Sequence, residues 1–320
     1  MYVCATKIDD MNKYVKVAIA VLVLSFIFIY FFIPNEIKVT QSYMIPQPSI
    51  AVARSLTSLN TWNQWMPAKK LNQDTVQLES GFLCFNQSLL STVNTTYNTQ
   101  DFSVPVVFFA TAKGKDTSLI EYESIVDNRH VSPFDRISAY WKSLKVKSQM
   151  NKVLTAAANF YTQTENIYGI KIIPDRVKDS VLISTNKTFT DTPTVQVQYE
   201  MIQSLEQYIQ KNNGQIQGAP MVNITKIGEA NVFTQVAYPL AKSIPVNDQF
   251  QIKKMVLGNI LTVTVTGDNQ KVIHAFNETE NFIHERAISS PAIPFIVYNT
   301  NRLTEKDATK WKSTIYYPVY

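Results

Sequence analysis

The sequence predicts an α+β protein with an N-terminal transmembrane helix and two globular domains. Three features of the 320-residue chain lead to this prediction. An uncharged apolar run covers residues 17–33, and a pattern of strand, helices, strands and one long helix extends to residue 164. Residues 168–320 then repeat a strand–helix–strand–strand unit. At roughly 100–200 residues per domain, the length agrees with two domains.

Residues 17–33 form the predicted membrane anchor. The run ends at Pro34 and lies at the short end of the ~17–25 residues that span a bilayer. A cleaved signal peptide is the alternative, but no small-x-small cleavage site follows the run. Lys7, Lys13 and Lys16 precede the span and only Lys38 follows it closely, so we expect residues 1–16 in the cytoplasm. The prediction is a single-pass protein of the inner (cytoplasmic) membrane with an extracytoplasmic body.

Residues 36–164 are expected to form a sheet that packs against a long helix. Residues 36–45 alternate as in a strand, Pro48 is suited to begin a helix, and residues 74–126 have the pattern of short strands between polar turns. Pro133 begins a helical pattern whose apolar stripe is expected to face the sheet. The members of this stripe are Phe134, Ile137, Tyr140 or Trp141, Leu144, Met150, Val153, Leu154, Ala157 and Phe160.

This order of elements resembles the START-like (SRPBCC, polyketide-cyclase-like) helix-grip domain. The resemblance rests on the Pro48 helix that leads into Trp62-x-x-Trp65-x-Pro67, on the strands, and on the last helix from Pro133. It implies an apolar ligand between the sheet and the long helix, with Trp62 and Trp65 lining the pocket. The alternative is that both tryptophans pack in the core at a helix-to-strand corner.

Residues 168–320 contain two copies of one unit, at about 168–240 and 249–320. Residues 205–209 stand 74 positions before residues 279–283, and Pro220 stands 74 before Pro294. Near the ends of the copies, Tyr238-Pro-Leu and Tyr317-Pro-Val are 79 positions apart. Duplicated units of this size usually form one pseudo-symmetric domain, and we expect a cleft between the copies.

The duplication is similar to the gyrase-inhibitor-like effector-binding domain of bacterial regulators. It shares Gly218-Ala219-Pro220 after the first helix and the run Ile315-Tyr-Tyr-Pro-Val at the end. In such domains, a glutamate two residues before the second-repeat tyrosine contacts cationic ligands or assists hydrolysis. The tyrosine matches Tyr298, but Ile296 occupies the glutamate position, so the carboxylate for both roles is missing. The two modules together resemble a bacterial family of membrane-anchored envelope proteins.

Aromatic residues near the second-repeat tyrosine are the most ligand-like group of this domain, because such rings can stack and orient a flat organic molecule. The alternative is that they fill the core. Glu200 and Glu229 are candidate replacement carboxylates, or else face solvent. The members of this aromatic group are Tyr238, Tyr298, Trp311, Tyr316 and Tyr317.

No catalytic set, metal site or cofactor motif is present in the sequence. The eight glycines form neither a dinucleotide fingerprint nor a phosphate loop, and the three histidines lack the spacing of metal ligands. Cys84 is expected to be a small buried residue. The net charge of +5 is spread thinly along the chain, so no nucleic-acid partner is expected.

We therefore expect a membrane-tethered, non-enzymatic protein that binds a small apolar or aromatic molecule. One alternative is a hydrolase or cyclase that acts on a small hydrophobic compound. Another is a structural envelope protein that uses filled folds as interaction surfaces. A DNA-binding regulator is disfavoured because the anchor and the START-like module stand where a helix-turn-helix domain would be. The expected ligand-binding residues are Trp62, Trp65, Tyr238, Ile296, Tyr298, Trp311 and Tyr317.

Overall fold

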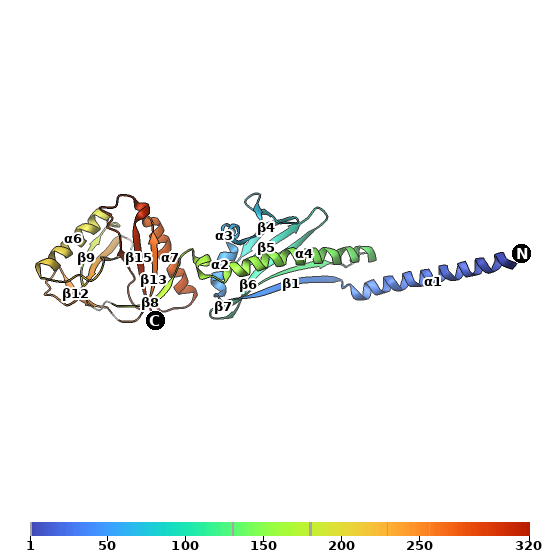
Figure 1. The fold of residues 1–320 in the computed structure, drawn as a ribbon, viewed down its shortest axis with the longest axis horizontal. Helices are drawn as coiled ribbons and strands as arrows, with labels where there is room; N and C mark the ends of the chain where they lie inside the picture. Colours follow the sequence, from blue (N-terminus) through green and yellow to red (C-terminus); the bar gives the residue numbers. More distant parts are fainter. Residues whose placement is uncertain (1, 130, 179–180, 229, 256) are drawn as a thin grey trace. The chain divides into compact units, whose positions relative to one another are not determined.

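The computed structural model describes residues 2–129, 131–178, 181–228, 230–255 and 257–320. The chain divides into two compact units, Met1–Gln163 and Thr164–Tyr320 (Figure 1). In the described residues, each unit combines helices with one antiparallel sheet, and an apolar helix begins the chain. The predicted α+β class and N-terminal apolar helix are therefore confirmed.

The first unit is a sheet that grips one long helix, as the helix-grip prediction requires. After α1 (Tyr2–Phe32) and β1 (Glu36–Ile45) come two short helices, α2 (Ser49–Thr57) and α3 (Leu59–Trp65). The described strands are ordered β1-β7-β6-β5-β4-β3-β2, and α4 (Pro133–Tyr161) follows them. Their bounds are Lys69–Lys70 for β2, Thr75–Gln77 for β3, Phe82–Leu89 for β4, Thr92–Asn98 for β5, Ser103–Gly114 for β6 and Thr117–Asp127 for β7.

Alternation along the strands turns one face of this sheet toward α4. In β7, every second residue from Ser118 to Ser124 is buried, and the hydroxyl of Tyr122 donates to Asn151 Oδ1 of α4 at 2.7 Å. The helix begins where the side chain of Ser132 accepts from the backbone N–H of Asp135, with Pro133 in its first turn. The predicted helix start is thus explained by its cap.

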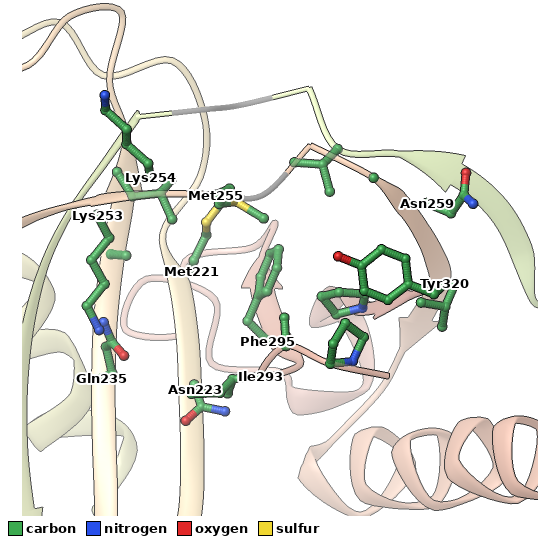
Figure 2. A pocket seen from close by; sticks show the side chains of 18 residues that line it. Met221, Asn223, Gln235, Lys253, Lys254, Met255, Asn259, Ile293, Phe295 and Tyr320 are labelled. Atoms are coloured by element: carbon green, nitrogen blue, oxygen red, sulfur yellow. The ribbon is translucent and has the colours of Figure 1, made fainter. Parts of the chain in front are cut away.

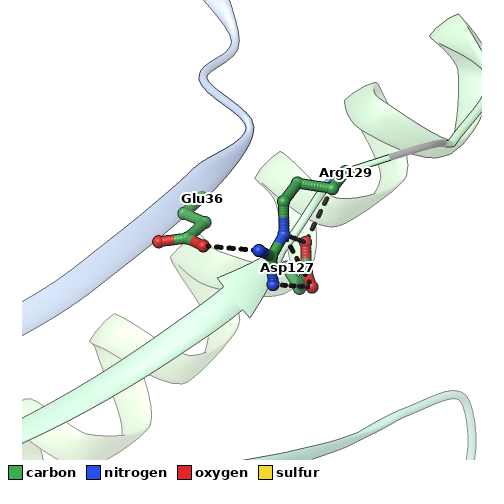
Figure 3. Close-up of polar contacts among 3 residues, drawn as sticks. All are labelled: Glu36, Asp127 and Arg129. Atoms are coloured by element: carbon green, nitrogen blue, oxygen red, sulfur yellow. Dashed lines mark hydrogen bonds and ion pairs between the residues drawn. The ribbon is translucent and has the colours of Figure 1, made fainter.

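An exposed group of charges lies where β1 and β7 pair, because Glu36 faces Asp127 in the register. Figure 3 shows Arg129 between them, with Nη2 2.8 Å from Asp127 Oδ2 and Nη1 3.5 Å from Glu36 Oε1. The hydrogen bonds to Asp127 raise the pKa of Arg129. All three side chains are exposed, so these pairs contribute little to the free energy of folding.

The predicted apolar stripe of α4 is wrong in its N-terminal half. Phe134 and Trp141 are 71% and 62% exposed, and Tyr140 and Leu144 are exposed as well. The sheet side of this half instead carries mostly small side chains, which allow the helix to lie close to the strands. They are Ala139, Ser143 and Val146, together with Arg136. Cys84, predicted to be buried, is only half-buried on β4.

The second unit consists of two strand–helix–strand–strand copies in one sheet, which confirms the predicted duplication. The copies are β9-α6-β10-β11 and β13-α7-β14-β15. The described strands are ordered β12-β9-β11-β10-β14-β15-β13-β8, so the copies meet where Val222 of β10 faces Ile296 of β14. The bounds of the first part are Thr164–Tyr168 (α5), Ile173–Arg176 (β8), Val181–Phe189 (β9), Val195–Lys211 (α6), Met221–Ile227 (β10) and Asn231–Pro239 (β11). Those of the second are Gln251–Lys254 (β12), Asn259–Thr266 (β13), Asn269–Glu285 (α7), Phe295–Tyr298 (β14) and Lys312–Val319 (β15), with a short 3-10 helix at Ala308–Lys310.

The two faces of this sheet bury different residues, because neighbours on a strand point to opposite sides. Val222 and Tyr298 belong to the cluster on the face that packs against α6, which includes Leu205. Met221 and Val297 belong to a smaller cluster on the other face. Residues two positions apart on one strand share a face of the sheet, so Ile296 and Tyr298 of β14 both lie on the face that packs against α6.

Both copies end their helix in the same way, although the residues differ. In α6 the N–H of Gly214 donates to Ile209 O at 2.8 Å, and in α7 the N–H of Ile288 donates to Ile283 O at 2.9 Å. The residue before each donor has a left-handed backbone, with φ of 52° at Asn213 and 48° at Ala287. This is the Schellman motif, whose left-handed position favours glycine.

Replacing Ala287 with glycine is expected to stabilise the second unit by about 0.5–1 kcal/mol. The left-handed backbone costs a Cβ-bearing residue roughly 1–2 kcal/mol, and the extra freedom of glycine in the unfolded chain offsets part of that gain. Asn213→Gly is the matched variant and should gain less, because asparagine tolerates this conformation. Hydrogen exchange of the α6 and α7 amides measures the change in stability of each variant. An Ala287→Gly gain no larger than that of Asn213→Gly, or a loss of stability, would contradict the left-handed backbone at Ala287.

Candidate functional site

A cavity of about 900 Å³ lies between the two copies of the second unit. Its walls come from the start of α6, from α7, and from the central strands β10 and β14. Most of the side chains here are apolar or aromatic. Among them are Val195, Val222, Ile224, Val272, Ile273, Phe276, Ile296 and Tyr298. The duplication thus places the cavity where the sequence predicts a cleft.

A hydrogen-bonded group of aromatic and polar residues lies beside the cavity. Tyr298 donates to Gln198 Oε1 at 2.7 Å, and both residues are buried and line the cavity. The ring of Tyr199 stacks with that of Tyr298 at 6.3 Å, and the Tyr199 hydroxyl donates to the Thr300 carbonyl at 3.3 Å. These bonds hold the rings of Tyr199 and Tyr298 in defined positions beside the cavity.

Arg302 is the buried charge of this site and lines the cavity with a side chain only 4% exposed. Its guanidinium carbon is 3.7 Å from the ring centroid of Tyr298 and 5.0 Å from that of Trp311. Nη1 donates to Asn269 Oδ1 at 2.7 Å and Nη2 donates to Ser313 Oγ at 2.8 Å. Burial lowers the pKa of Arg302, but an arginine stays protonated in proteins, so the site holds a positive charge.

Each copy also pairs a tyrosine of its last strand with a glutamate of its helix. Tyr238 donates to Glu206 in the first copy, and Tyr317 donates to Glu280 Oε1 at 3.4 Å in the second. Burial, and then the contact with the glutamate, raises the pKa of Tyr238 and of Tyr317. Burial also raises the pKa of Tyr298, so all three tyrosines are neutral donors at pH 7.

Raising the pH above about 10 is expected to weaken the second unit, because Tyr238 ionises in the unfolded chain at about pH 10 but only at higher pH in the folded protein. The stability that this shift contributes is full below pH ~10 and is lost as pH rises toward the folded pKa. Urea denaturation at pH 9 and 11 should show a smaller loss for Tyr238→Phe than for the unaltered protein. The control is Tyr320→Phe at the exposed end, and identical losses in all three proteins would contradict the prediction.

A second hollow, of about 370 Å³, lies on the opposite face of the same sheet. Figure 2 shows Met221, Met255 and Phe295 gathered in its centre, with Lys253 and Lys254 toward one side and Tyr320 toward the other. A further hollow of about 240 Å³ shares Met221, Met255 and Phe295 with it. The larger cavity is the better candidate, because Ile296, Tyr298 and Tyr317 of the predicted residues line it.

The structure brings together some of the predicted ligand residues and separates others. Ile296, Tyr298 and Tyr317 line the large cavity. Tyr238 is buried in the adjoining core with Tyr298, and Trp311 contacts Arg302 and donates from Nε1 to the Glu305 carbonyl at 2.9 Å. Tyr316 stacks on Phe295 at 5.1 Å and lines the 240 Å³ hollow. No periodic pattern points to Gln198, Asn269 or Arg302, because the first two lie at helix starts and Arg302 lies in a loop.

Trp62 and Trp65 lie in the core of the first unit. Their rings are 4.9 Å apart, and the Trp62 ring meets Phe85 and Phe108 edge-on at 4.5 Å and 5.5 Å. Nε1 of Trp62 donates to the carbonyl of Leu56 at 2.6 Å. This packing agrees with the interpretation that both tryptophans are core residues. A role for them in ligand binding stays a prediction.

The candidates for chemistry do not assemble into a reactive group in the described part of the chain. Glu200 is exposed and accepts from Gln196 Nε2 at 3.3 Å, while Glu229 and His130 lie outside the described residues. His274 and His284 are exposed on α7. No group of three or more His, Cys, Asp or Glu in the described ranges could hold a metal ion. The arrangement is suited to binding.

The sequence matches no protein-family model and no curated protein. Among solved structures it is similar to the EcmrR C-terminal domain, at 11% identity over 47% of this chain and 98% of that one, with a TM-score of 0.42. An uncharacterized conserved protein from Listeria innocua matches at 11% identity over 50% and 98%, with a TM-score of 0.37. The Zhui aromatase/cyclase from a Streptomyces species matches at 8% over 39% and 92%, with a TM-score of 0.26. Each of these three TM-scores is below 0.5.

Proposed function

We propose that this protein binds a small apolar or aromatic molecule in the cavity between the two repeats of its second unit, and that α1 tethers it to a membrane. The observation that carries the proposal is the cavity of about 900 Å³, with apolar walls and a few fixed polar groups. Ligand sites of ~300–1,000 Å³ have this composition. The proposal places the ligand against Ile296 and Tyr298.

Binding without chemistry is the function we favour. The acid that lines the cavity among the described residues is Glu280, which is exposed and bonded to Tyr317. A hydrolase or cyclase of the predicted kind needs an enclosed carboxylate beside the aromatic rings. The exposed Glu200 does not supply one.

The membrane tether is supported by the composition of α1 and by its contacts. Val15–Phe32 is an 18-residue stretch with a mean hydropathy of 2.6. The hydroxyl of Tyr30 donates to the Val131 carbonyl at 3.2 Å, and Arg136 lies 4.2 Å from the Tyr30 ring while donating to the Ile33 carbonyl at 2.9 Å. A removed signal peptide would make no use of such contacts, so we favour a retained anchor. The lysines that precede it, Lys7, Lys13 and Lys16, favour a body outside the cytoplasm.

Exposed aromatic residues of α4 give this tether a second point of contact. The Phe134 ring meets Phe26 of α1 edge-on at 5.7 Å, which places the start of α4 beside the end of the apolar helix. Tyr140 and Trp141 follow on the exposed side of α4. Tyrosine and tryptophan are enriched at membrane–water interfaces. We place this surface at the headgroup level of the bilayer.

Brominated lipids are therefore expected to quench the fluorescence of Trp141 when the full chain is in lipid nanodiscs. The emission intensity lost to brominated lipid should fall in Trp141→Phe and stay unchanged in Trp62→Phe, because Trp62 is buried in protein. Steady-state fluorescence with and without brominated lipid measures this difference. Equal quenching in Trp141→Phe and the unaltered protein would show that this face of α4 is away from lipid.

Native mass spectrometry of the full chain in nanodiscs, after incubation with a lipid and metabolite extract, tests the binding function. We expect a retained small molecule, and we expect Ile273→Asp to lose it because that residue lines the cavity. The matched control is Ile50→Asp, an exposed isoleucine on α2 of the first unit. No retained molecule, or equal retention in both variants, would overturn the proposal.

A further inference from the structure

The positive charge of Arg302 is the feature of the cavity that the sequence did not predict. The side chain is 4% exposed, and two of its five N–H groups are used by Asn269 and Ser313. Its Nε has no hydrogen-bond partner in the described part of the chain. Of its three guanidinium nitrogens, Nε is thus the one without a hydrogen-bond partner among the described residues.

No described carboxylate balances this charge. The ion pairs of the described residues do not include Arg302, and its polar partners are a neutral amide and a hydroxyl. The rings of Tyr298 and Trp311 lie within cation–π distance of the guanidinium carbon, but both rings are uncharged. Burying a charge without an opposite charge is costly, so an anion that reached Arg302 would gain the missing compensation.

The surroundings of Arg302 restrict what that anion is. The cavity walls at Val272, Phe276 and Ile296 are apolar, so the bulk of the ligand must be apolar or aromatic. Glu280 is exposed, whereas Arg302 is buried, so the enclosed charge of the cavity is positive. A carboxylate is planar and matches two N–H groups of a guanidinium edge.

We propose that the ligand of this cavity is an organic anion, with an apolar or aromatic body and a carboxylate that binds Arg302. This inference rests on the proposed binding function and adds the charge class of the ligand. The isoleucine at position 296 fits the same assignment, because it leaves the cavity without the carboxylate that a cationic ligand would need.

Three naphthalene probes that differ only in charge test the proposal on the full chain in nanodiscs. They are 1-naphthoate, neutral 1-naphthamide and 1-naphthylmethylammonium, and titration calorimetry gives each dissociation constant, with empty nanodiscs as the blank. We expect 1-naphthoate to bind at least tenfold more tightly than the amide, which is about 1.4 kcal/mol, and the cation to bind most weakly. Binding of the amide or the cation as tightly as the anion would overturn the carboxylate assignment and keep the binding function. Absence of binding by all three overturns both.

Two variants of Arg302 test whether its positive charge causes the preference for the anionic probe. Arg302→Met keeps a long side chain without charge and should reduce the anion preference to less than twofold. Arg302→Lys keeps the charge and should retain part of the preference. Circular dichroism checks that each variant is folded, and the probe comparison on the unaltered chain decides the question if Arg302→Met does not fold. A full anion preference in folded Arg302→Met would contradict the role of Arg302.

Discussion

Replacing Trp62 with alanine is expected to destabilise the first unit by about 3–5 kcal/mol, the range for losing a large aromatic side chain from a core. Trp62 is 1% exposed and packs against Trp65, Phe85 and Phe108. Its removal would leave a cavity and deprive the Leu56 carbonyl of its donor. Most domains are stable by only about 5–15 kcal/mol, so this change alone is a large part of the total.

Hydrogen exchange of the β5 to β7 amides measures the effect of Trp62→Ala in that unit alone. The control is Ile50→Ala on the neighbouring helix α2, where the side chain is 60% exposed and the change should stay within about 0.5 kcal/mol. A loss below about 1 kcal/mol for Trp62→Ala would mean that the tryptophan borders an empty space, as the pocket interpretation of the START-like resemblance requires.

Replacing Ile296 with glutamate is expected to weaken binding of an apolar anion such as 1-naphthoate at least tenfold. The new carboxylate would lose its water when the ligand covers it, which is costly for a charged group. It would also offer Arg302 an opposite charge in the same cavity. The order of the naphthalene probes should therefore shift toward the cation.

Titration calorimetry of the full chain measures this change. Ile173→Glu is the matched control, because Ile173 is an exposed isoleucine on β8 of the same unit and does not line the cavity. We expect less than a threefold change there. Unaltered affinity and unaltered probe order in Ile296→Glu would place the binding site elsewhere on the protein.

Local signals predict much of this fold. The 74-residue offset between the copies extends to details of the structure, because α6 and α7 begin and end at equivalent positions, and the Thr194 and Asp268 caps also differ by 74. Period-two alternation predicts the strands, and Pro133 predicts the start of α4. These features depend on residues that are close together in the chain, so they can be predicted from a single sequence.

The α4 stripe shows where such reasoning fails. Phe134 and Trp141 look like core residues because they are large and apolar, yet the sheet side of the helix there is built from small residues such as Ala139. Helical spacing alone does not say which of two faces is buried when one carries small residues and the other large ones. The proposed contact with the membrane explains why the large residues Phe134 and Trp141 lie on the exposed face of α4.

The site depends on contacts between distant segments, which one sequence does not contain. Arg302 lies in the loop after β14, and its partners Asn269 and Ser313 come from the start of α7 and from β15. Asn269 and Arg302 are 33 residues apart, so no spacing rule connects them. Tyr298 and Ile296 could be predicted only because the resemblance to effector-binding domains identifies their positions.

Photoaffinity labelling shows where on the protein an apolar anion binds. A diazirine derivative of 1-naphthoate would be irradiated with the full chain in nanodiscs, and labelled peptides would be identified with and without excess 1-naphthoate. We expect labels that the excess competitor removes, within residues 192–198, 222–233, 269–280 and 293–302, which contain the cavity lining of α6, β10, α7 and β14. Labels confined to the first unit, or labels that the competitor does not reduce, would contradict binding in this cavity.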